Sequence, residues 1–217
     1  DLFRALKDDP TINTTGGSGA LQNGWFPSPD AETYAAMIAD RRPVRILEVG
    51  GGYSTLVARK TIDLLGLDCS LEVIDPQPRT DVAAAVDRLH FLPVEDVPFA
   101  EFEGLDGLLF IDSSHITRIG GDIPLLFCEV IPSLAEGVGV HVHDVFIPYE
   151  YPPGAAKYLW TEQYVLEALL SRNPSYRVLF GTHFMTREHG DVMQSVIGSE
   201  VGLDVDHFGA SLWLEVL

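Results

Sequence analysis

Short apolar runs alternate along the chain with segments in which apolar residues recur at helical spacing. The runs predict buried strands at 44–49, 71–74, 90–92, 105–111, 138–142, 176–180 and 210–216. The periodic segments predict helices at 31–40, 54–65, 80–88, 119–134 and 155–171. This alternation is typical of a parallel sheet with helices on both faces. We therefore expect an α/β fold of the doubly wound, Rossmann-like type.

The two ends of the chain are less regular. Within residues 1–28 we expect one short helix and a flexible stretch at 14–19, after which Ser28 or Asp30 caps the helix at 31–40. The segment 181–208 is rich in Gly, His and Asp and suggests an antiparallel excursion between the last two strands. There is no internal repeat or linker. We expect an N-terminal cap or lid over residues 1–40 and one main domain over 41–217.

The run 45–55, RILEVGGGYST, joins the first strand to a helix through three glycines. Without Cβ atoms, the backbone at 50–52 can press against a nucleotide-like ligand. A pyrophosphate prefers bare N–H groups at a helix start, whereas the carboxylate of Glu48 favours a ligand with positive charge. The turn therefore predicts a cationic nucleoside rather than a dinucleotide.

Polar residues follow the ends of the predicted parallel strands. They are Glu48 with the glycines, Asp75, Glu95 with Asp96, Asp112, and His143 with Asp144. In open α/β sheets, ligands lie beyond the carboxyl ends of the strands, so five such positions in register predict a site. Asp75 comes 23 residues after Gly52, where a carboxylate can accept hydrogen bonds from both ribose hydroxyls.

These motifs resemble those of class I S-adenosylmethionine-dependent methyltransferases over about residues 40–145. The resemblance implies a mostly parallel seven-stranded sheet with an antiparallel C-terminal strand, and S-adenosylmethionine as cofactor. It places Glu48 near the methionine part, Asp75 on the ribose and Glu95 beside the adenine. The implied cofactor-binding residues are Glu48, Gly50, Gly51, Gly52, Tyr53, Ser54, Asp75, Glu95 and Asp112. Ser54 replaces the family's usual third glycine and can still cap the helix.

The runs 110–115, FIDSSH, and 141–144, HVHD, are similar to a branch that acts on small molecules and sugars. Many members of that branch, macrolide-sugar O-methyltransferases among them, bind a divalent metal. The resemblance implies Asp112 and Asp144 as metal ligands, with His143 in place of an acidic residue. Because Mg²⁺ prefers oxygen ligands, this histidine weakens the case for Mg²⁺. Three states of the site therefore stay open, namely bound Mg²⁺, a bound softer metal and no metal.

The candidate catalytic residues are His115, His143 and Asp112. Methyl transfer to a hydroxyl needs a base, and imidazole titrates near the working pH. The alternative for His115 is that it supports the following helix. His141 lies inside a buried strand, where we expect a hydrogen-bonded core histidine.

Aromatic residues cluster in two further segments. Tyr149, Tyr151 and Trp160 either shape an acceptor pocket or pack beneath a helix. Trp25 and Phe26 pose the same choice in the N-terminal segment, where we favour a lid.

Composition narrows the partners. Fourteen basic against thirty-two acidic residues give a net charge of −18, which disfavours nucleic acid and anionic membranes. Cys69 and Cys128 are expected to be buried thiols in a reducing compartment. With no bilayer-spanning run and no signal-peptide core, we expect a cytoplasmic protein. The chain starts with Asp1 rather than Met, so we expect that its native N-terminus was trimmed or left out.

The sequence thus predicts a methyltransferase that acts on an oxygen or nitrogen of a small molecule, such as a sugar or secondary metabolite. An NAD-dependent Rossmann oxidoreductase is one alternative, against which Glu48 argues because it would repel a pyrophosphate. A catalytically inert S-adenosylmethionine-binding module is another. The acceptor and the oligomeric state, a homo-oligomer included, are left open.

Overall fold

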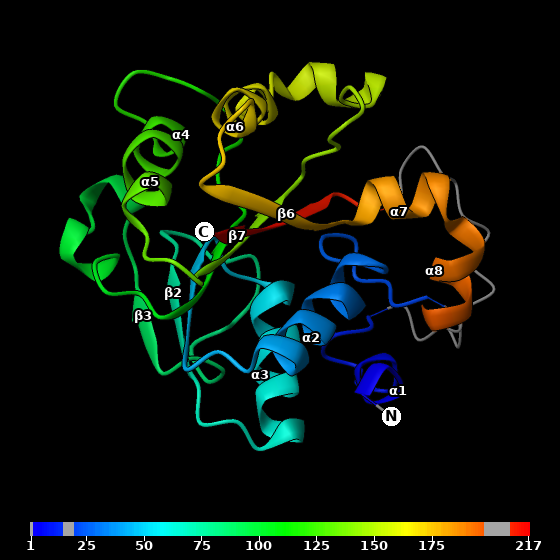
Figure 1. The fold of residues 1–217 in the computed structure, drawn as a ribbon. Coiled ribbons are helices and arrows are strands. Elements are labelled where there is room, and N and C mark those ends of the chain that lie inside the picture. Colours follow the sequence, from blue (N-terminus) through cyan, green and yellow to red (C-terminus); the bar gives the residue numbers. More distant parts are fainter. Residues whose placement is uncertain (1, 15–19, 198–208) are drawn as a thin grey trace.

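A seven-stranded sheet forms the centre of the protein (Figure 1). The computed structural model describes residues 2–14, 20–197 and 209–217. The strand order is β3-β2-β1-β4-β5-β7-β6. All neighbours from β3 to β5 are parallel, whereas β7 is antiparallel to both β5 and β6. The predicted doubly wound, mostly parallel sheet with an antiparallel C-terminal strand is confirmed.

The strands follow the predicted apolar runs closely. They are β1 (Arg45–Val49), β2 (Ser70–Ile74), β3 (Arg88–His90), β4 (Gly107–Ile111), β5 (Gly139–His143), β6 (Tyr176–Gly181) and β7 (Ser211–Val216). The largest shift is in β3, which was predicted at 90–92. Its pairing with β2 runs from Arg88 to His90, and Phe91 is exposed beyond it. The apolar signal of Phe91 therefore does not mark a buried position in this edge strand.

The longer helices are α2 (Asp30–Arg41), α3 (Tyr53–Leu65), α6 (Glu162–Leu170), α7 (Thr182–Glu188) and α8 (Gly190–Ile197). The predicted helix at 119–134 is a continuous helical segment made of α4 (Asp122–Leu125), the π-helical turn η3 (Leu126–Val130) and α5 (Ile131–Ser133). The remaining elements are α1 (Leu2–Lys7) and the 3₁₀ turns η1 (Val94–Asp96), η2 (Phe99–Glu101) and η4 (Pro153–Tyr158).

Two helix predictions were wrong. The segment 80–88 forms a turn instead, because the Asp81 carboxylate accepts a hydrogen bond from the Ala83 amide and competes with helix formation. The helix predicted at 155–171 is divided into η4 and α6. Between them, Leu159 has a φ of 59°, and the amide of Thr161 donates to the carbonyl of His115 at 2.8 Å.

The predicted cap of α2 was also wrong. Its N-cap residue is Pro29, and no side chain caps the helix. The Ser28 hydroxyl bonds to Glu32, and Asp30 bonds to Thr182 far along the chain. The expected excursion between the last two strands contains α7 and α8, while 198–208 and 15–19 of the expected flexible stretch lie outside the described residues.

Helices cover both faces of the sheet (Figure 1). On one face, Ile46 and Phe110 pack with residues of α2 and α3. On the other, Leu47 and Ile111 pack with residues of α4, η3 and α6. The N-terminal segment contributes its buried apolar residues, Leu6, Ile12, Leu21 and Phe26, to the first of these cores. The division into a cap and a main domain stays a prediction.

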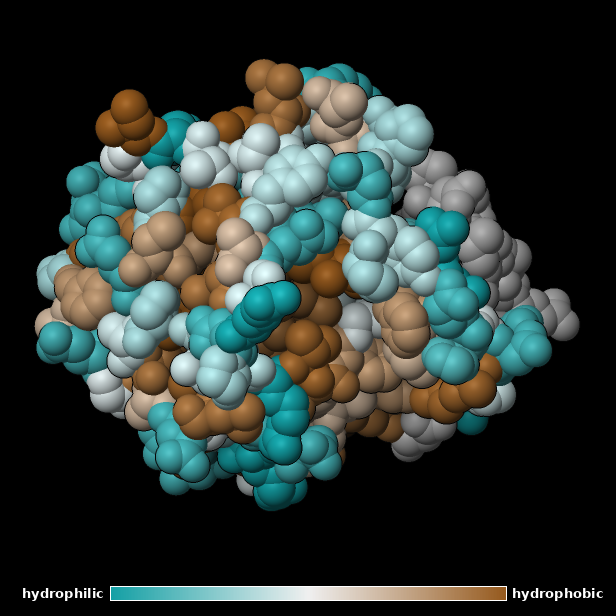
Figure 2. Space-filling view, turned by 45° about the horizontal axis from the view of Figure 1, so that its top comes forward, coloured by the Kyte–Doolittle hydropathy of each residue, from teal (hydrophilic) through white to brown (hydrophobic). Residues whose placement is uncertain are grey.

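The surface is mixed. On the face drawn in Figure 2, apolar residues form separate patches among polar ones.

Cys69 is buried as expected, but the prediction for Cys128 was wrong, because its helical turn presents it to solvent. Within the described residues, no helix is both long enough and apolar enough to cross a membrane.

Candidate functional site

The glycine turn is packed directly against the end of β4. Gly50 has a φ of 93°, and a Cβ atom placed there would lie 1.9 Å from the carbonyl oxygen of Asp112. The amide of Asp112 donates to the carbonyl of Val49 at 2.8 Å, which joins the ends of β1 and β4. At Gly51, a Cβ atom would lie 2.7 Å from Cγ1 of Val73. The turn therefore excludes side chains at both positions.

Asp75, just after β2, closes the other side of this turn. One oxygen of its carboxylate accepts a hydrogen bond from the amide of Gly51 at 2.7 Å, and the other accepts from the amide of Gln77 at 2.7 Å. The guanidinium of Arg79 stacks on the ring of Trp25 at 3.8 Å. The structure thus brings Asp75 and the three glycines together, while the proposed ribose contact stays a prediction.

Glu48 lies beneath the turn and is fully buried. Its carboxyl group bonds to the hydroxyl of Tyr34 at 2.9 Å and to Oγ1 of Thr55 at 2.5 Å. Oγ1 of Thr55 also accepts from the amide of Gly52 at 3.1 Å. Burial raises the pKa of Glu48 to about 8. In this structure Glu48 supports the turn from below, and its predicted nearness to the cofactor stays a prediction.

The remaining predicted cofactor residues are spread more widely. Tyr53 begins α3, and Ser54 is buried in its first turn without a capping bond, so the expected Ser54 cap was wrong. The hydroxyl of Thr55 instead accepts a hydrogen bond from the amide of Gly52, which precedes the helix. Glu95, in η1, faces Arg118 at 3.4 Å. The cofactor roles of Tyr53, Ser54 and Glu95 stay predictions.

Asp112, His115, His143 and Asp144 come together beside the glycine turn. Nε2 of His115 lies 3.3 Å from the Asp112 carboxylate and 3.5 Å from that of Asp144. Nδ1 of His143 lies 3.5 Å from Asp112 and 3.7 Å from Asp144. His115 and Asp144 both have a positive φ, which turns each backbone segment toward the cluster. The predicted catalytic and metal-ligating residues therefore share one place.

A buried carboxylate supports His115 from behind. Nδ1 of His115 bonds to Oε1 of Glu162, the first residue of α6, and Glu162 has no exposed surface. Burial alone would lower the pKa of His115, but the charges of Glu162 and Asp112 raise it well above its ordinary value. The ring of Trp160 lies 4.9 Å from that of His115. The carbonyl of His115 also accepts hydrogen bonds from the amides of Thr161 and Glu162 at the start of α6, whereas its support of the following helix stays a prediction.

Asp30 lies behind His143 at ion-pair distance, without a hydrogen bond to the ring. Nε2 of His143 lies 3.6 Å from Asp30, which also accepts from the Thr182 hydroxyl at 2.6 Å and the Ala210 amide at 3.0 Å. Burial alone would lower the pKa of His143, but the charges of Asp144 and Asp112 raise it well above its ordinary value. Phe26 packs on His143 with 5.0 Å between ring centroids. Phe26 is therefore a buried packing residue, and a lid formed by its segment stays a prediction.

Glu162 and Asp30 were not predicted as site residues. Glu162 follows the loop after β5 and was predicted only as part of a long helix, and Asp30 was predicted only as a cap. Both reach the cluster through contacts between distant parts of the chain. The one local signal was an acidic residue in the first turn of a helix.

His141 is buried in β5, as predicted, but the expected hydrogen bonds are not found. Neither ring nitrogen has a hydrogen-bond partner within the described part of the chain. The ring stacks instead on Trp213, with 4.1 Å between centroids and 10° between planes. Burial lowers the pKa of His141 well below its ordinary value, so the ring is neutral.

Asp112, His143 and Asp144 fit a divalent ion. One ligand atom from each lies within 4.8 Å of the others. Neither ring nitrogen of His143 has a hydrogen-bond partner among the described residues, although the side chain is only 4 % exposed. No Lys or Arg of the described ranges pairs with Asp112 or Asp144, and the basic side chains beside them are His115 and His143.

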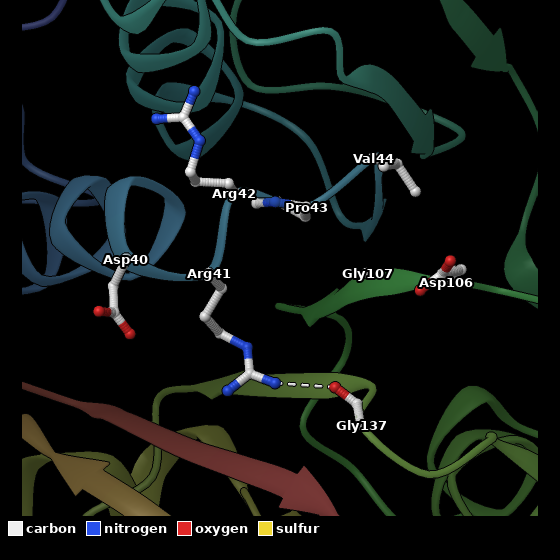
Figure 3. A pocket seen from close by; sticks show the side chains of 8 residues that line it. All are labelled: Asp40, Arg41, Arg42, Pro43, Val44, Asp106, Gly107 and Gly137. Atoms are coloured by element: carbon white, nitrogen blue, oxygen red, sulfur yellow. Dashed lines mark hydrogen bonds between the residues drawn. The ribbon is translucent and has the colours of Figure 1, made fainter.

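Two other features lie away from this cluster. Glu72, His90 and Glu101 also lie close together, but Glu72 forms a bidentate pair with Arg45, and Glu101 pairs with Arg88. A pocket of about 340 Å³ opens between the end of α2 and the start of β4 (Figure 3). It lies at the amino ends of the strands, the edge opposite to the glycine turn.

Comparisons with solved structures give the fold. No protein-family model matches the chain, and no curated protein matches it. A putative O-methyltransferase from Klebsiella pneumoniae is 17 % identical with a TM-score of 0.56, covering 99 % of this chain and 89 % of that one. An O-methyltransferase from Bacillus cereus in complex with S-adenosylhomocysteine is 12 % identical with a TM-score of 0.59, covering 97 % and 92 %.

An O-methyltransferase from Streptomyces achromogenes involved in tomaymycin synthesis, solved with S-adenosylmethionine, is 18 % identical with a TM-score of 0.54. The match covers 87 % of this chain and 80 % of that one. Together with the strand order and the single antiparallel strand β7, these similarities show that the chain has the class I methyltransferase fold.

Proposed function

We propose that this protein transfers a methyl group from S-adenosylmethionine to an oxygen or nitrogen of a small molecule. One observation carries the proposal. The backbone of Asp112 packs on Gly50 of the glycine turn, and its side chain lies 3.3 Å from Nε2 of His115. A ligand held by the turn is therefore adjacent to a group that can take a proton. In keeping with this, the similar structures described above are O-methyltransferases, two of them with S-adenosylmethionine or its product.

The turn and Asp75 would hold the cofactor. The open backbone at 50–52 would allow close approach of a nucleoside, and the Asp75 carboxylate would accept hydrogen bonds from ribose hydroxyls. The cofactor brings its own leaving group, so the chain needs no covalent nucleophile. Its main task is to hold the sulfonium carbon and the acceptor atom in line.

His115 is the proposed general base. Its Nε2 faces the cluster, and its Nδ1 is held by Glu162, so the ring orientation is fixed before the acceptor binds. The surrounding carboxylates favour the protonated ring in the absence of other ligands. A positive charge brought by the cofactor opposes that effect and lowers the pKa again. The ring of Trp160 packs against that of His115 at a tilt, with 4.9 Å between centroids.

Asp112, His143 and Asp144 would hold a divalent metal. When bound, such an ion polarises an acceptor hydroxyl as a Lewis acid.

The proposal includes a sugar or secondary metabolite as the acceptor. It also includes a cytoplasmic location. The latter is supported by the unpaired state of both cysteines.

Calorimetric titration tests cofactor choice. We expect S-adenosylmethionine and S-adenosylhomocysteine to bind with micromolar affinity, and NAD not to bind. Binding of NAD without binding of either nucleoside would favour the oxidoreductase alternative.

Turnover is tested separately by formation of S-adenosylhomocysteine with a panel of sugars, phenols and amines, with and without divalent metal. We expect product with at least one acceptor class. Cofactor binding without product across the whole panel would favour the inert binding module.

A further inference from the structure

The cluster beside the glycine turn contains a donor set that differs from a pure oxygen site. Asp112 and Asp144 offer carboxylate oxygens, and His143 offers a ring nitrogen. The nitrogen Nδ1 lies 3.5 Å from Asp112 and 3.7 Å from Asp144, too far for good hydrogen bonds. Ligand atoms about 2.1 Å from a tetrahedral ion lie about 3.4 Å apart, against about 3.0 Å around an octahedral one. The two distances from Nδ1 lie nearer to the first of these values than to the second. The ligand oxygens of Asp112 and Asp144 lie within 4.8 Å of each other.

The burial of His143 gives an independent reason to expect a ligand. Its side chain is 4 % exposed, and neither ring nitrogen has a hydrogen-bond partner in the described ranges. Buried polar atoms without partners are rare in folded proteins. An ion bound at Nδ1 gives that nitrogen a partner, and Nε2 on the opposite side of the ring faces the carboxylate of Asp30 at 3.6 Å. That carboxylate–histidine–metal arrangement recurs in metal sites.

Hydrogen bonds hold the carboxylate of Asp30 in place behind the His143 ring. It receives hydrogen bonds from the Thr182 hydroxyl at 2.6 Å and from the Ala210 amide at 3.0 Å. Its carboxylate is therefore anchored by α7 and the start of β7, and it can orient the His143 ring from behind. The segments that contain Asp30, Thr182 and Ala210 thus meet behind the imidazole of His143.

The acidic cluster of Glu72, His90 and Glu101 differs from the Asp112–Asp144 site in its arginine partners. At Glu72 and Glu101, arginine side chains already neutralise both carboxylates. At Asp112 and Asp144, the groups within ion-pair distance are histidines alone among the described residues. The second pair of carboxylates thus has no arginine or lysine partner among the described residues.

We propose that Asp112, His143 and Asp144 bind a divalent transition-metal ion such as Co²⁺ or Zn²⁺, with Nδ1 of His143 as a ligand, in preference to Mg²⁺. Mg²⁺ demands oxygen ligands in near-octahedral geometry, whereas imidazole suits ions of the later transition series. His115 stays outside the ligand set, because its Nε2 faces Oδ1 of Asp112 and Oδ2 of Asp144, whereas Nδ1 of His143 faces the other oxygen of each carboxylate. The inference rests on the proposed function in one respect only, namely that the bound ion would act as a Lewis acid on the acceptor.

The experiment measures metal binding alone. Tag-free protein, stripped with a chelator, is titrated with MgCl₂, CoCl₂ and ZnCl₂ by calorimetry, without cofactor. We expect one Co²⁺ or Zn²⁺ per chain, with an affinity at least about tenfold higher than for Mg²⁺. The visible spectrum of the Co²⁺ form should show the intense bands of a four-coordinate site with a nitrogen ligand.

Two variants and one control identify the ligands. His143→Asp converts the site to oxygen donors and should lower Co²⁺ affinity about 10–100-fold while raising that for Mg²⁺. Asp144→Asn, at a partly exposed position, should lower Co²⁺ affinity to a similar degree and serves if His143→Asp does not fold. His90→Gln alters the histidine of the other acidic cluster and should leave Co²⁺ affinity unchanged.

Three results overturn the proposal: equal affinity for Mg²⁺ and Co²⁺, no binding of any ion up to about 1 mM, or full Co²⁺ affinity in Asp144→Asn. S-adenosylhomocysteine is titrated in parallel on the metal-free protein. If it binds and the ions do not, the metal inference alone fails. If the ions bind and it does not, the proposed function fails and the metal site stands.

Discussion

Nδ1 of His115 is hydrogen-bonded to Glu162, a carboxylate that lies 47 residues later and is fully buried. The bond joins the loop after β4 to the start of α6. It fixes the plane of the imidazole and leaves Nε2 directed at Asp112 and Asp144. Orientation of a base by a buried carboxylate is a general device of catalytic sites. Glu162 is therefore a positioning residue for the proposed base.

Glu162→Gln tests this role. The amide keeps the shape of the side chain but removes the charge that orients and stabilises the imidazole. We expect kcat for methyl transfer to fall about 10–100-fold, with cofactor affinity unchanged, since supporting residues of this kind have effects of that size. Steady-state kinetics with calorimetry of S-adenosylhomocysteine binding gives both quantities.

Glu167→Gln is the matched control, because Glu167 lies on the same helix and is exposed. It should leave kcat within about twofold of the unaltered protein, as surface changes usually do. Equal losses in the two variants would show that Glu162 has no special role.

Gly50→Ala should disrupt the glycine turn. The added methyl group would lie 1.9 Å from the carbonyl oxygen of Asp112, and the φ of 93° is strained for alanine. We expect the free energy of unfolding to fall by at least about 3 kcal/mol and cofactor binding to be lost. Urea unfolding and calorimetry measure the two effects.

Gly66→Ala is a control for backbone strain alone. Gly66 also has a positive φ, but an added methyl group would meet nothing within 4 Å. The change should cost only about 1–2 kcal/mol and leave cofactor binding intact. A Gly50→Ala protein that binds cofactor normally would contradict the packing described for the turn.

Asp75→Ala should weaken cofactor binding. It removes the carboxylate that accepts from the Gly51 amide at 2.7 Å and that is proposed to accept from the ribose hydroxyls. Hydrogen bonds to a charged group are each worth about 1.5–3 kcal/mol, so we expect a rise in Kd of about 10–100-fold or more. Asp81→Ala, which removes only a local turn bond to Ala83, should leave Kd unchanged.

The sequence predicted the sheet well because its signals are local. Buried parallel strands are short apolar runs, and the polar residues that follow them, Asp75, Asp112 and His143, mark the edge where ligands bind. The helix predicted at 80–88 was wrong because one side-chain bond from Asp81 outweighed a weak periodicity. Asp30 and Glu162 could not be found in this way. Their roles depend on contacts 113 and 47 residues away in sequence, and no local pattern reports such contacts.

Asp30→Ala should lower the stability of the protein. The carboxylate accepts hydrogen bonds from Thr182 and Ala210 and faces His143, so its removal leaves buried donors without an acceptor. Breaking such a buried network costs about 3 kcal/mol. Urea unfolding should show this loss in the midpoint with an unchanged slope, whereas Asp40→Ala, at an exposed position of the same helix, should change stability by less than about 0.5 kcal/mol.

Glu48 should make stability depend on pH. Burial raises the pKa of its carboxyl group from 4.5 to about 8, so between these values the folded protein retains a proton that the unfolded chain releases. Stability from this group is therefore present below pH 4.5 and is lost as the pH rises to about 8. The full loss amounts to roughly 4–5 kcal/mol.

Glu48→Gln stays neutral at every pH and should remove this loss. We expect the variant to match the unaltered protein below pH 4.5 and to exceed its stability above pH 8. Glu72→Gln provides a comparison of opposite sign, because the bidentate bond to Arg45 lowers the pKa of Glu72. That variant should be less stable at neutral pH, with the difference shrinking as the pH falls below 4.5. Parallel stability curves for the Glu48→Gln and unaltered proteins would show that Glu48 is ionised in the folded state, as a carboxylate facing a cationic ligand would be.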